Sequence, residues 1–285
     1  RQADTLGLIN YGRVLTRSEA VTVQVAPLVE GLLRRLAELI VEARDGGTLD
    51  TLGSSPDYLA FCQETVGLQA LSVGLPLLSE AEQCALWLNL YNLMFLHAFV
   101  EYGNGRETVQ PNMLLYGLGD QVQVSLEMIV LDILRLPSPV APRATHPWAV
   151  SRSTSSAWYA LLLAPHPGPS RLFIVDRSGD NITHLAMTAL GAFATATVER
   201  GGSAVTADSC SIPRALLNAL GGASEPYVCD TMGADSPWSR ALVQLVPPEV
   251  AQRVGWTATG PPRLHVLPPP AEGTVATFAL DSLAR

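Results

Sequence analysis

Three polar side chains interrupt one of the most apolar stretches of the chain. Asn89, Asn92 and His97 lie between residues 85 and 100, where nearly every other residue is apolar or aromatic. Buried amides must be hydrogen-bonded, because each unmade bond costs about 1–3 kcal/mol. The simpler interpretation is a structural network that pins a neighbouring loop or strand. The alternatives are an interface, or the wall of a site where an asparagine holds a ligand and His97 moves a proton.

Candidate nucleophiles lie elsewhere in the sequence. Ser178 belongs to a polar turn between an expected strand and an expected alanine-rich helix. Backbone amides at the start of that helix could bind an anion, although a plain turn is the simpler interpretation. Cys84 and His97 are thirteen residues apart on one expected helix, about 20 Å along its axis, so they form no dyad. An enzyme would therefore pair His97 with Ser178 or with Cys210.

The sequence contains no motif for a metal ion or a cofactor. The four cysteines form no Cys-x-x-Cys pair, and no two histidines have the helical spacing of a zinc protease. All 18 basic residues are arginines, which excludes Schiff-base and P-loop-lysine chemistry. The net charge of −8 disfavours nucleic acid as a ligand, because phosphate binding needs a basic surface. We predict no metal, no cofactor and no nucleic-acid partner.

Composition places the chain among globular proteins. Hydrophobic residues make up 48% and charged residues 15% of the 285 residues, which supports a large apolar core and excludes a disordered chain. Because the cysteines provide no disulfide framework, they indicate a reduced, intracellular setting, most simply the cytoplasm. No run of about 18 apolar residues is uninterrupted, so we predict no membrane span.

The elements that must position these side chains are mostly helices. Regularly spaced leucines predict a helix over 25–43, and Ser79 with Glu82 forms a capping box that opens a helix running to about residue 102. The other expected elements are a helix over 55–65, a hairpin over 113–124, a helix over 125–136, a strand over 172–176, a helix over 183–199, a helix from 211 to 222 and partly helical sequence over 237–253.

These elements predict an α+β fold. We expect a mainly helical single domain with a small antiparallel sheet or hairpin and an N-terminal helical flank. The flank covers residues 1–54 and the domain covers residues 55–285. A proline-rich excursion over 137–170 interrupts the domain.

The apolar helix and the segment after it resemble a known family in their residues and spacing. The matching residues are Trp87, Asn89, Tyr91, Asn92 and His97, followed by Ser125, Leu126, Ile129, Ile133, Leu134 and Arg135. This pattern is similar to that of the domain-of-unknown-function 547 family. The likeness covers roughly residues 55 to 270 and is strongest at 58–135. The binding residues we expect are Asn89, Tyr91, Asn92 and Arg171.

The chain departs from the family pattern at polar positions. Phe173 stands where the family has His, Ser178 stands where it has Cys, and Val130–Leu131 replace a Glu-His pair. A His, a Cys and an acid that meet in space would indicate thiol chemistry. The resemblance therefore implies a divergent member that has lost this polar cluster. The catalytic candidates that remain are His97, Ser178, Asn89 and Asn92.

A non-catalytic protein-interaction or scaffold module is the function that the sequence favours. Its protein partners would be contacted through the 137–170 excursion or the proline-rich tail. One alternative is a papain-like or transglutaminase-like hydrolase or transferase that uses His97 with Ser178 or Cys210. Another is a structural subunit of a larger assembly, because obligate interfaces resemble a protein core. The sequence leaves open whether the chain is an enzyme.

Overall fold

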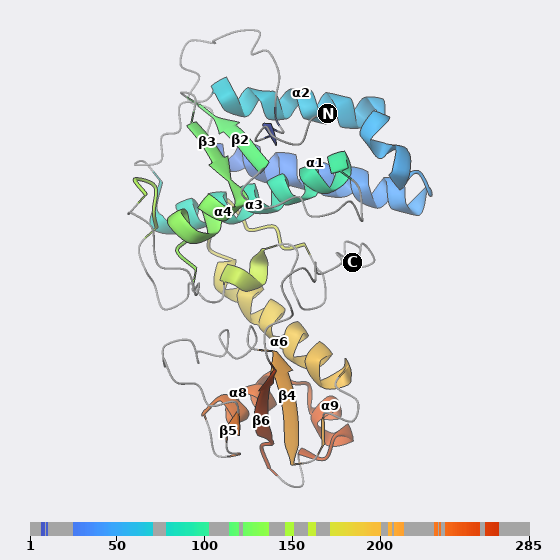
Figure 1. The fold of residues 1–285 in the computed structure, drawn as a ribbon, viewed down its shortest axis with the longest axis vertical. Helices are drawn as coiled ribbons and strands as arrows, with labels where there is room; N and C mark the ends of the chain where they lie inside the picture. The colour runs from blue at the N-terminus through green and yellow to red at the C-terminus, as the bar shows by residue number, and fades with distance from the viewer. Residues whose placement is uncertain are drawn as a thin grey trace.

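A computed structural model shows a helical layer, a long connecting helix and two small sheets. It describes residues 7–8, 10, 25–70, 78–102, 114–119, 122–136, 146–150, 159–163, 172–200, 205–206, 208–213, 231–232, 234, 237–256 and 260–267. Helices α1 (Val25–Asp45), α2 (Pro56–Val66) and α3 (Glu80–Tyr102) lie together in the upper part of Figure 1. The short 3₁₀ turns η1 (Leu49–Ser54) and η2 (Gly67–Ala70) flank α2.

Helix α3 lies at the centre of the helical layer. Leu33, Leu36 and Ile40 recur on one face of α1, are fully buried, and α1 packs along α3. Buried residues occur all round α3 between Cys84 and Ala98, as expected for a helix that is apolar on every face and sits inside a core. No helix in the described ranges has both the length and the apolar character needed to cross a bilayer.

The capping box expected at the start of α3 is confirmed, and α2 also begins at a capping residue. The Ser55 hydroxyl accepts a hydrogen bond from the Tyr58 backbone N–H at 3.2 Å. At α3 the Ser79 backbone N–H donates to the Glu82 carboxylate at 2.7 Å, and the Glu82 N–H donates to the Ser79 hydroxyl at 3.2 Å. These bonds satisfy amides that the first helical turn leaves unpaired, so local sequence fixes where α3 begins.

A three-stranded sheet contacts the helical layer at α3 and at η2. Strand β2 (Leu114–Leu118) pairs with β1 (Gly7–Leu8) in parallel and with β3 (Val122–Ser125) in an antiparallel hairpin. The sequence predicted this hairpin over 113–124, and it begins and ends one residue later. It is followed by the short helix α4 (Leu126–Met128), which Ser125 caps by accepting from the Met128 N–H at 3.0 Å.

The helix expected over 125–136 is interrupted. Beyond α4 the chain winds into a π-helical turn, η4 (Ile129–Ile133). Backbone bonds there run from Leu134 N to Ile129 O and from Leu136 N to Val130 O, and Arg135 has a φ of 55°. A left-handed residue of this kind ends a helix by satisfying its last carbonyls, so the α-helical prediction is too long.

The second group of elements packs around α6 (Ile182–Arg200). Helices α8 (Pro237–Leu245) and α9 (Pro248–Arg253) and strand β4 (Ser209–Pro213) contact α6, as the lower part of Figure 1 shows. Strand β6 (Arg263–Leu267) lies between β4, its parallel partner, and β5 (Thr231–Met232), its antiparallel partner. The 3₁₀ turn η5 (Ala160–Leu162) also contacts α6.

Two further expected elements differ in the structure. The helix expected over 211–222 is wrong at its start, because residues 209–213 instead pair with β6, a partner about fifty residues later in the chain; the rest of that expected helix lies outside the described residues. The strand expected over 172–176 is also wrong: that segment belongs to no strand ladder. In both cases a distant partner, invisible to a local pattern, decides the conformation.

A single hydrophobic cluster joins both groups of elements. It runs from Val25 in α1 to Leu264 in β6 and includes Trp87 of α3 and Phe193 of α6. The α+β prediction, mainly helical with small sheets, is therefore confirmed, and the N-terminal helix α1 shares its core with α3.

Candidate functional site

The amides of Asn89 and Asn92, here called the amide clamp, hold the segment that was expected to be a strand. Asn89 Nδ2 donates to the Val175 carbonyl at 2.6 Å, and Asn89 Oδ1 accepts from the Val175 N–H at 2.9 Å. Asn92 Nδ2 donates to the carbonyls of Leu162 and Phe173 at 2.8 and 3.1 Å. Both asparagines are buried. Two side chains on α3 thus take the place of a neighbouring strand for residues 173–175.

The turn after this segment approaches α3 closely. Gly179 has a φ of +74°, and a Cβ atom built on it would lie 2.4 Å from the Ala81 carbonyl oxygen. The hydroxyl of Ser178 accepts from the Asp180 N–H at 3.2 Å, and the Arg177 N–H donates to the Glu30 carboxylate of α1 at 3.0 Å. Ser178 therefore stands in a polar turn. The predicted binding residue Arg171 lies outside the described residues.

The other conspicuous residues of the helix are aromatic. Trp87 is fully buried and stacks on Trp148, with ring centroids 5.5 Å apart. Burial raises the pKa of the Tyr91 hydroxyl to about 12, so this side chain stays protonated at neutral pH. Both residues pack in or against the core.

His97 faces a different side of α3 from the amide clamp. Its Nδ1 lies 2.6 Å from the Tyr116 hydroxyl of β2, and its Nε2 lies 3.6 Å from the Cys62 thiol of α2. The rings of Tyr58 and Phe61 meet the imidazole edge to face, at centroid distances of 5.8 and 5.3 Å. His97 itself is fully buried.

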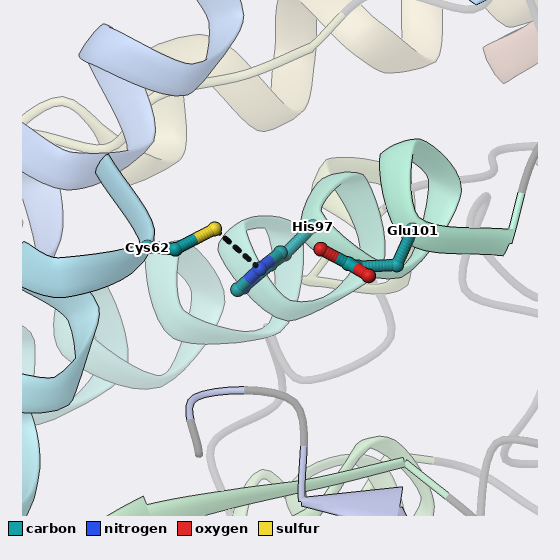
Figure 2. Close-up of side chains that lie close together, drawn as sticks. All are labelled: Cys62, His97 and Glu101. Atoms are coloured by element: carbon teal, nitrogen blue, oxygen red, sulfur yellow. Dashed lines mark hydrogen bonds between the residues drawn. The ribbon is translucent and has the colours of Figure 1, made fainter. Parts of the chain in front are cut away.

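Cys62, His97 and Glu101 form a compact group, here called the α2–α3 cluster. One ligand atom from each lies within 4.8 Å of the others, and Figure 2 shows the imidazole between the thiol and the carboxylate. Glu101 accepts a hydrogen bond from the Tyr58 hydroxyl at 2.9 Å. Glu101 is exposed, Cys62 is half-buried and His97 is buried, so the cluster reaches from the core to the surface.

Burial keeps the thiol and the imidazole uncharged. It lowers the pKa of His97 to about 4. It also raises the pKa of Cys62 to about 11, and the negative charge of Glu101 acts in the same direction. Burial raises the pKa of the Tyr116 hydroxyl well above its ordinary value. At neutral pH the cluster therefore contains a neutral thiol beside a neutral imidazole.

A third buried asparagine fixes the strand that carries Tyr116. Asn10 Nδ2 donates to the carbonyls of Thr65 and Gly117 at 3.2 and 2.9 Å, and its Oδ1 accepts from the Gly117 N–H at 2.8 Å. Its own backbone carbonyl accepts from the side-chain amide of Gln69. These bonds tie the hairpin to the end of α2. Sequence reasoning missed Asn10, because no local pattern marks it.

The structure does not support the loss of a polar cluster that the family resemblance implied. A His, a Cys and an acid do meet, but Cys62 supplies the thiol and Glu101 the acid. One signal was present in the sequence: Tyr58 and Cys62, and likewise His97 and Glu101, are four residues apart on predicted helices and so share a helix face.

The nucleophiles predicted for His97 have other partners. The Ser178 hydroxyl bonds within its turn, and the buried Cys210 thiol lies on β4, where it contacts the Ser211 carbonyl at 3.9 Å. The hydrogen-bond partners of His97 among the described residues are Tyr116 and Cys62.

Residues 75–169 match the model of the family described as a protein of unknown function, DUF547. This segment is similar to DUF547 domains. The resemblance noted from sequence is thus confirmed over these residues. No curated protein and no solved structure matches the chain significantly. The DUF547 domain contains α3 with His97 and Glu101, whereas Cys62 precedes it, so the α2–α3 cluster combines the domain with a helix outside its matched range.

Proposed function

We propose that the chain is a non-catalytic scaffold module that works through contacts with protein partners. The observation that carries this proposal is the amide clamp. Asn89 and Asn92, two buried polar residues of the apolar helix α3, hydrogen-bond to the backbone of residues 162 and 173–175. Such amides hold the chain together, and their donors are directed at carbonyls of the fold rather than at a ligand.

The electrostatics of the α2–α3 cluster support the same proposal. A cysteine nucleophile reacts as the thiolate, which a nearby cation or a helix N-terminus normally stabilises. Cys62 lies in the second half of α2, and both burial and Glu101 raise its pKa, to about 11. His97, with a pKa near 4, supplies no positive charge at neutral pH. The free thiols of Cys62, Cys84 and Cys210 support a reducing, intracellular setting.

The pH dependence of Cys62 alkylation tests the non-catalytic character. In chelator-treated, metal-free protein, we expect iodoacetamide to modify Cys62 slowly at pH 7, with a rate that climbs through pH 10 without an earlier plateau. Peptide mass spectrometry would follow this site separately, with free cysteine as the reference. The Glu101→Gln variant removes a neighbouring negative charge and should shift the profile to lower pH. A plateau below pH 8 would show a thiolate at neutral pH and overturn the proposal.

The partner contacts need a separate test. The Cys62→Ala and Ser178→Ala variants should capture the same proteins as the unmodified chain from a lysate of the source organism, because neither side chain is needed for a scaffold. Quantitative mass spectrometry of the captured proteins would compare the three. Loss of the captured set with either variant, at unchanged far-ultraviolet circular dichroism, would contradict the proposal.

A thiol hydrolase or transferase is the second candidate, and one observation favours it. Cys62 Sγ lies 3.6 Å from His97 Nε2, and Tyr116 contacts the other ring nitrogen, where an orienting group stands in a catalytic triad. In this version Cys62 is the nucleophile in place of Ser178 or Cys210. The alkylation profile separates the two candidates, because only the enzyme requires a thiolate near neutral pH.

The structural-subunit alternative receives less support. The exposed large hydrophobic residues among the described positions are Leu59, Tyr102 and Met187. They belong to three different helices, α2, α3 and α6. An obligate interface needs a broad contiguous apolar patch, and scattered single residues do not indicate one.

A further inference from the structure

We propose that Cys62, His97 and Glu101 form a binding site for a transition-metal ion of the zinc class. Their ligand atoms lie within 4.8 Å of one another and come from two adjacent helices. Thiolate, imidazole and carboxylate are the three side-chain ligands that zinc uses in proteins. This site goes beyond the scaffold function proposed above, since the amide clamp lies on another side of α3.

The distance between sulfur and nitrogen fits a tetrahedral ion. Zinc bonds of about 2.3 Å to sulfur and about 2.05 Å to nitrogen, at a tetrahedral angle, separate the two ligand atoms by about 3.6 Å. Cys62 Sγ and His97 Nε2 are 3.6 Å apart. The two ligands therefore stand at the spacing that binding requires, without movement of either helix. Glu101 is exposed and can complete the triangle by rotating its side chain.

The surroundings of His97 hold the ring as a metal ligand needs. Coordination through Nε2 places the proton on Nδ1, and a ligating histidine usually donates that proton to a fixed oxygen atom. The Tyr116 hydroxyl lies 2.6 Å from Nδ1 and can accept it. Tyr58 and Phe61 contact the imidazole edge to face, which limits its rotation. The ligand is thus oriented before any ion arrives.

The charge of the ligands and the exposure of the α2–α3 cluster also suit a divalent metal ion. A thiolate and a carboxylate together neutralise a divalent ion, and metal binding releases the thiol proton that burial otherwise retains. Sulfur and nitrogen ligands favour zinc over magnesium or calcium, which prefer oxygen. The exposed Glu101 and half-buried Cys62 leave the outer side open to an entering ion. Three protein ligands would leave a fourth position for water.

Cobalt(II) is the most direct probe of this site. We expect the full chain, stripped with chelator and titrated with Co²⁺, to develop a near-ultraviolet thiolate-to-cobalt charge-transfer band and visible bands typical of tetrahedral cobalt. Zn²⁺ should abolish these bands by competition, and Mg²⁺ should not. Equilibrium dialysis followed by elemental analysis should give one zinc ion per chain. Absence of the charge-transfer band, or zinc bound at well below one ion per chain, would overturn the proposal.

Variants identify the ligands. Cys62→Ala should remove the charge-transfer band, and Cys84→Ala, which alters a buried thiol on α3, should keep it. Glu101→Gln changes an exposed residue and should weaken binding without affecting the fold. Tyr116→Phe should weaken binding about 10- to 100-fold, as loss of an orienting partner does. A band that survives Cys62→Ala, in a protein with unchanged circular dichroism, would refute this ligand set. None of these results bears on the amide clamp or on partner capture.

Discussion

Asn89, Asn92 and His97 lie within nine residues on one helix, yet they have separate surroundings. The two asparagines hydrogen-bond to the backbone of Leu162 and Val175. His97 instead lies among the aromatic rings of α2 and β2. Because a helix turns by about 100° per residue, adjacent polar residues need not share a site. A mutation in one group should leave the chemistry of the other intact.

Acid should destabilise the folded protein through His97. In metal-free buffer the unfolded chain binds a proton at this residue near pH 6.5, whereas the folded chain does so only near pH 4. The unfolded state therefore binds more protons between these values, and the free energy of unfolding falls as the pH falls. The contribution of His97 is up to about 3 kcal/mol. Urea unfolding measured from pH 7 to pH 4 would show it.

The matched comparison uses two histidine variants. His97→Gln removes the buried titrating group and should flatten the pH dependence, even if its stability at pH 7 is lower. His184→Gln changes an exposed histidine of α6 and should follow the unmodified protein. An unchanged slope in His97→Gln would show that His97 is not the residue responsible.

The sequence predicts the role of some residues of the site but not the partners of others. The structural interpretation of the asparagines was available from their place in an apolar helix. The partners of His97 were not, because Cys62 comes from α2 and Tyr116 from β2, and helix packing alone decides which faces meet. The four-residue spacing of His97 and Glu101 was visible, but it gains meaning only once the facing thiol is known.

At the scale of elements, local patterns predicted the long helices and the 113–124 hairpin well, and they failed for segments whose partners are distant in the chain. Capping residues and apolar periodicity place α1, α2, α3 and α6 to within a few residues, because these signals lie inside each helix. Strand β4 was mistaken for a helix, since its pairing with β6 is not encoded locally. The 172–176 segment has the composition of a strand, but side-chain amides and not a neighbouring strand satisfy its backbone.

Gly179 should be indispensable to the placement of that segment. An alanine there would bring its Cβ to 2.4 Å from the Ala81 carbonyl oxygen, at a φ of +74° that side chains avoid. We expect Gly179→Ala to lower the free energy of unfolding by about 1–3 kcal/mol. Gly47→Ala is the control, because its φ is also positive but it meets no atom within 4 Å. Equal losses in both variants would attribute the effect to backbone conformation alone.

At the scale of the whole molecule, the matched family range covers only part of one continuous hydrophobic core. The DUF547 domain spans residues 75–169, but α3 buries its apolar surface against α1, and the segment held by the amide clamp follows the matched range. The continuous core from Val25 to Leu264 crosses both ends of the domain. The high content of hydrophobic residues predicted a large core. Which residues belong to that core depends on long-range packing, which the composition does not reveal.

A fragment limited to residues 75–169 should therefore fail to fold. It would expose the faces of α3 that α1 and residues 173–175 cover, and exposed apolar surface of this kind promotes aggregation. Far-ultraviolet circular dichroism and urea titration of the fragment would show weak, non-cooperative unfolding. A fragment that unfolds cooperatively as a monomer would show that the domain is self-sufficient.

The amide clamp also has a consequence for the order of folding events. Asn89 and Val175 are 86 residues apart, so their bonds close a long loop and belong to the slow, non-local class of contacts. We expect them to form after the rate-limiting step. Asn89→Ala should thus lower equilibrium stability by about 2–4 kcal/mol, speed unfolding, and leave the refolding rate nearly unchanged in stopped-flow chevron measurements. The two buried asparagines of α3 would then secure the finished structure without guiding the chain towards it.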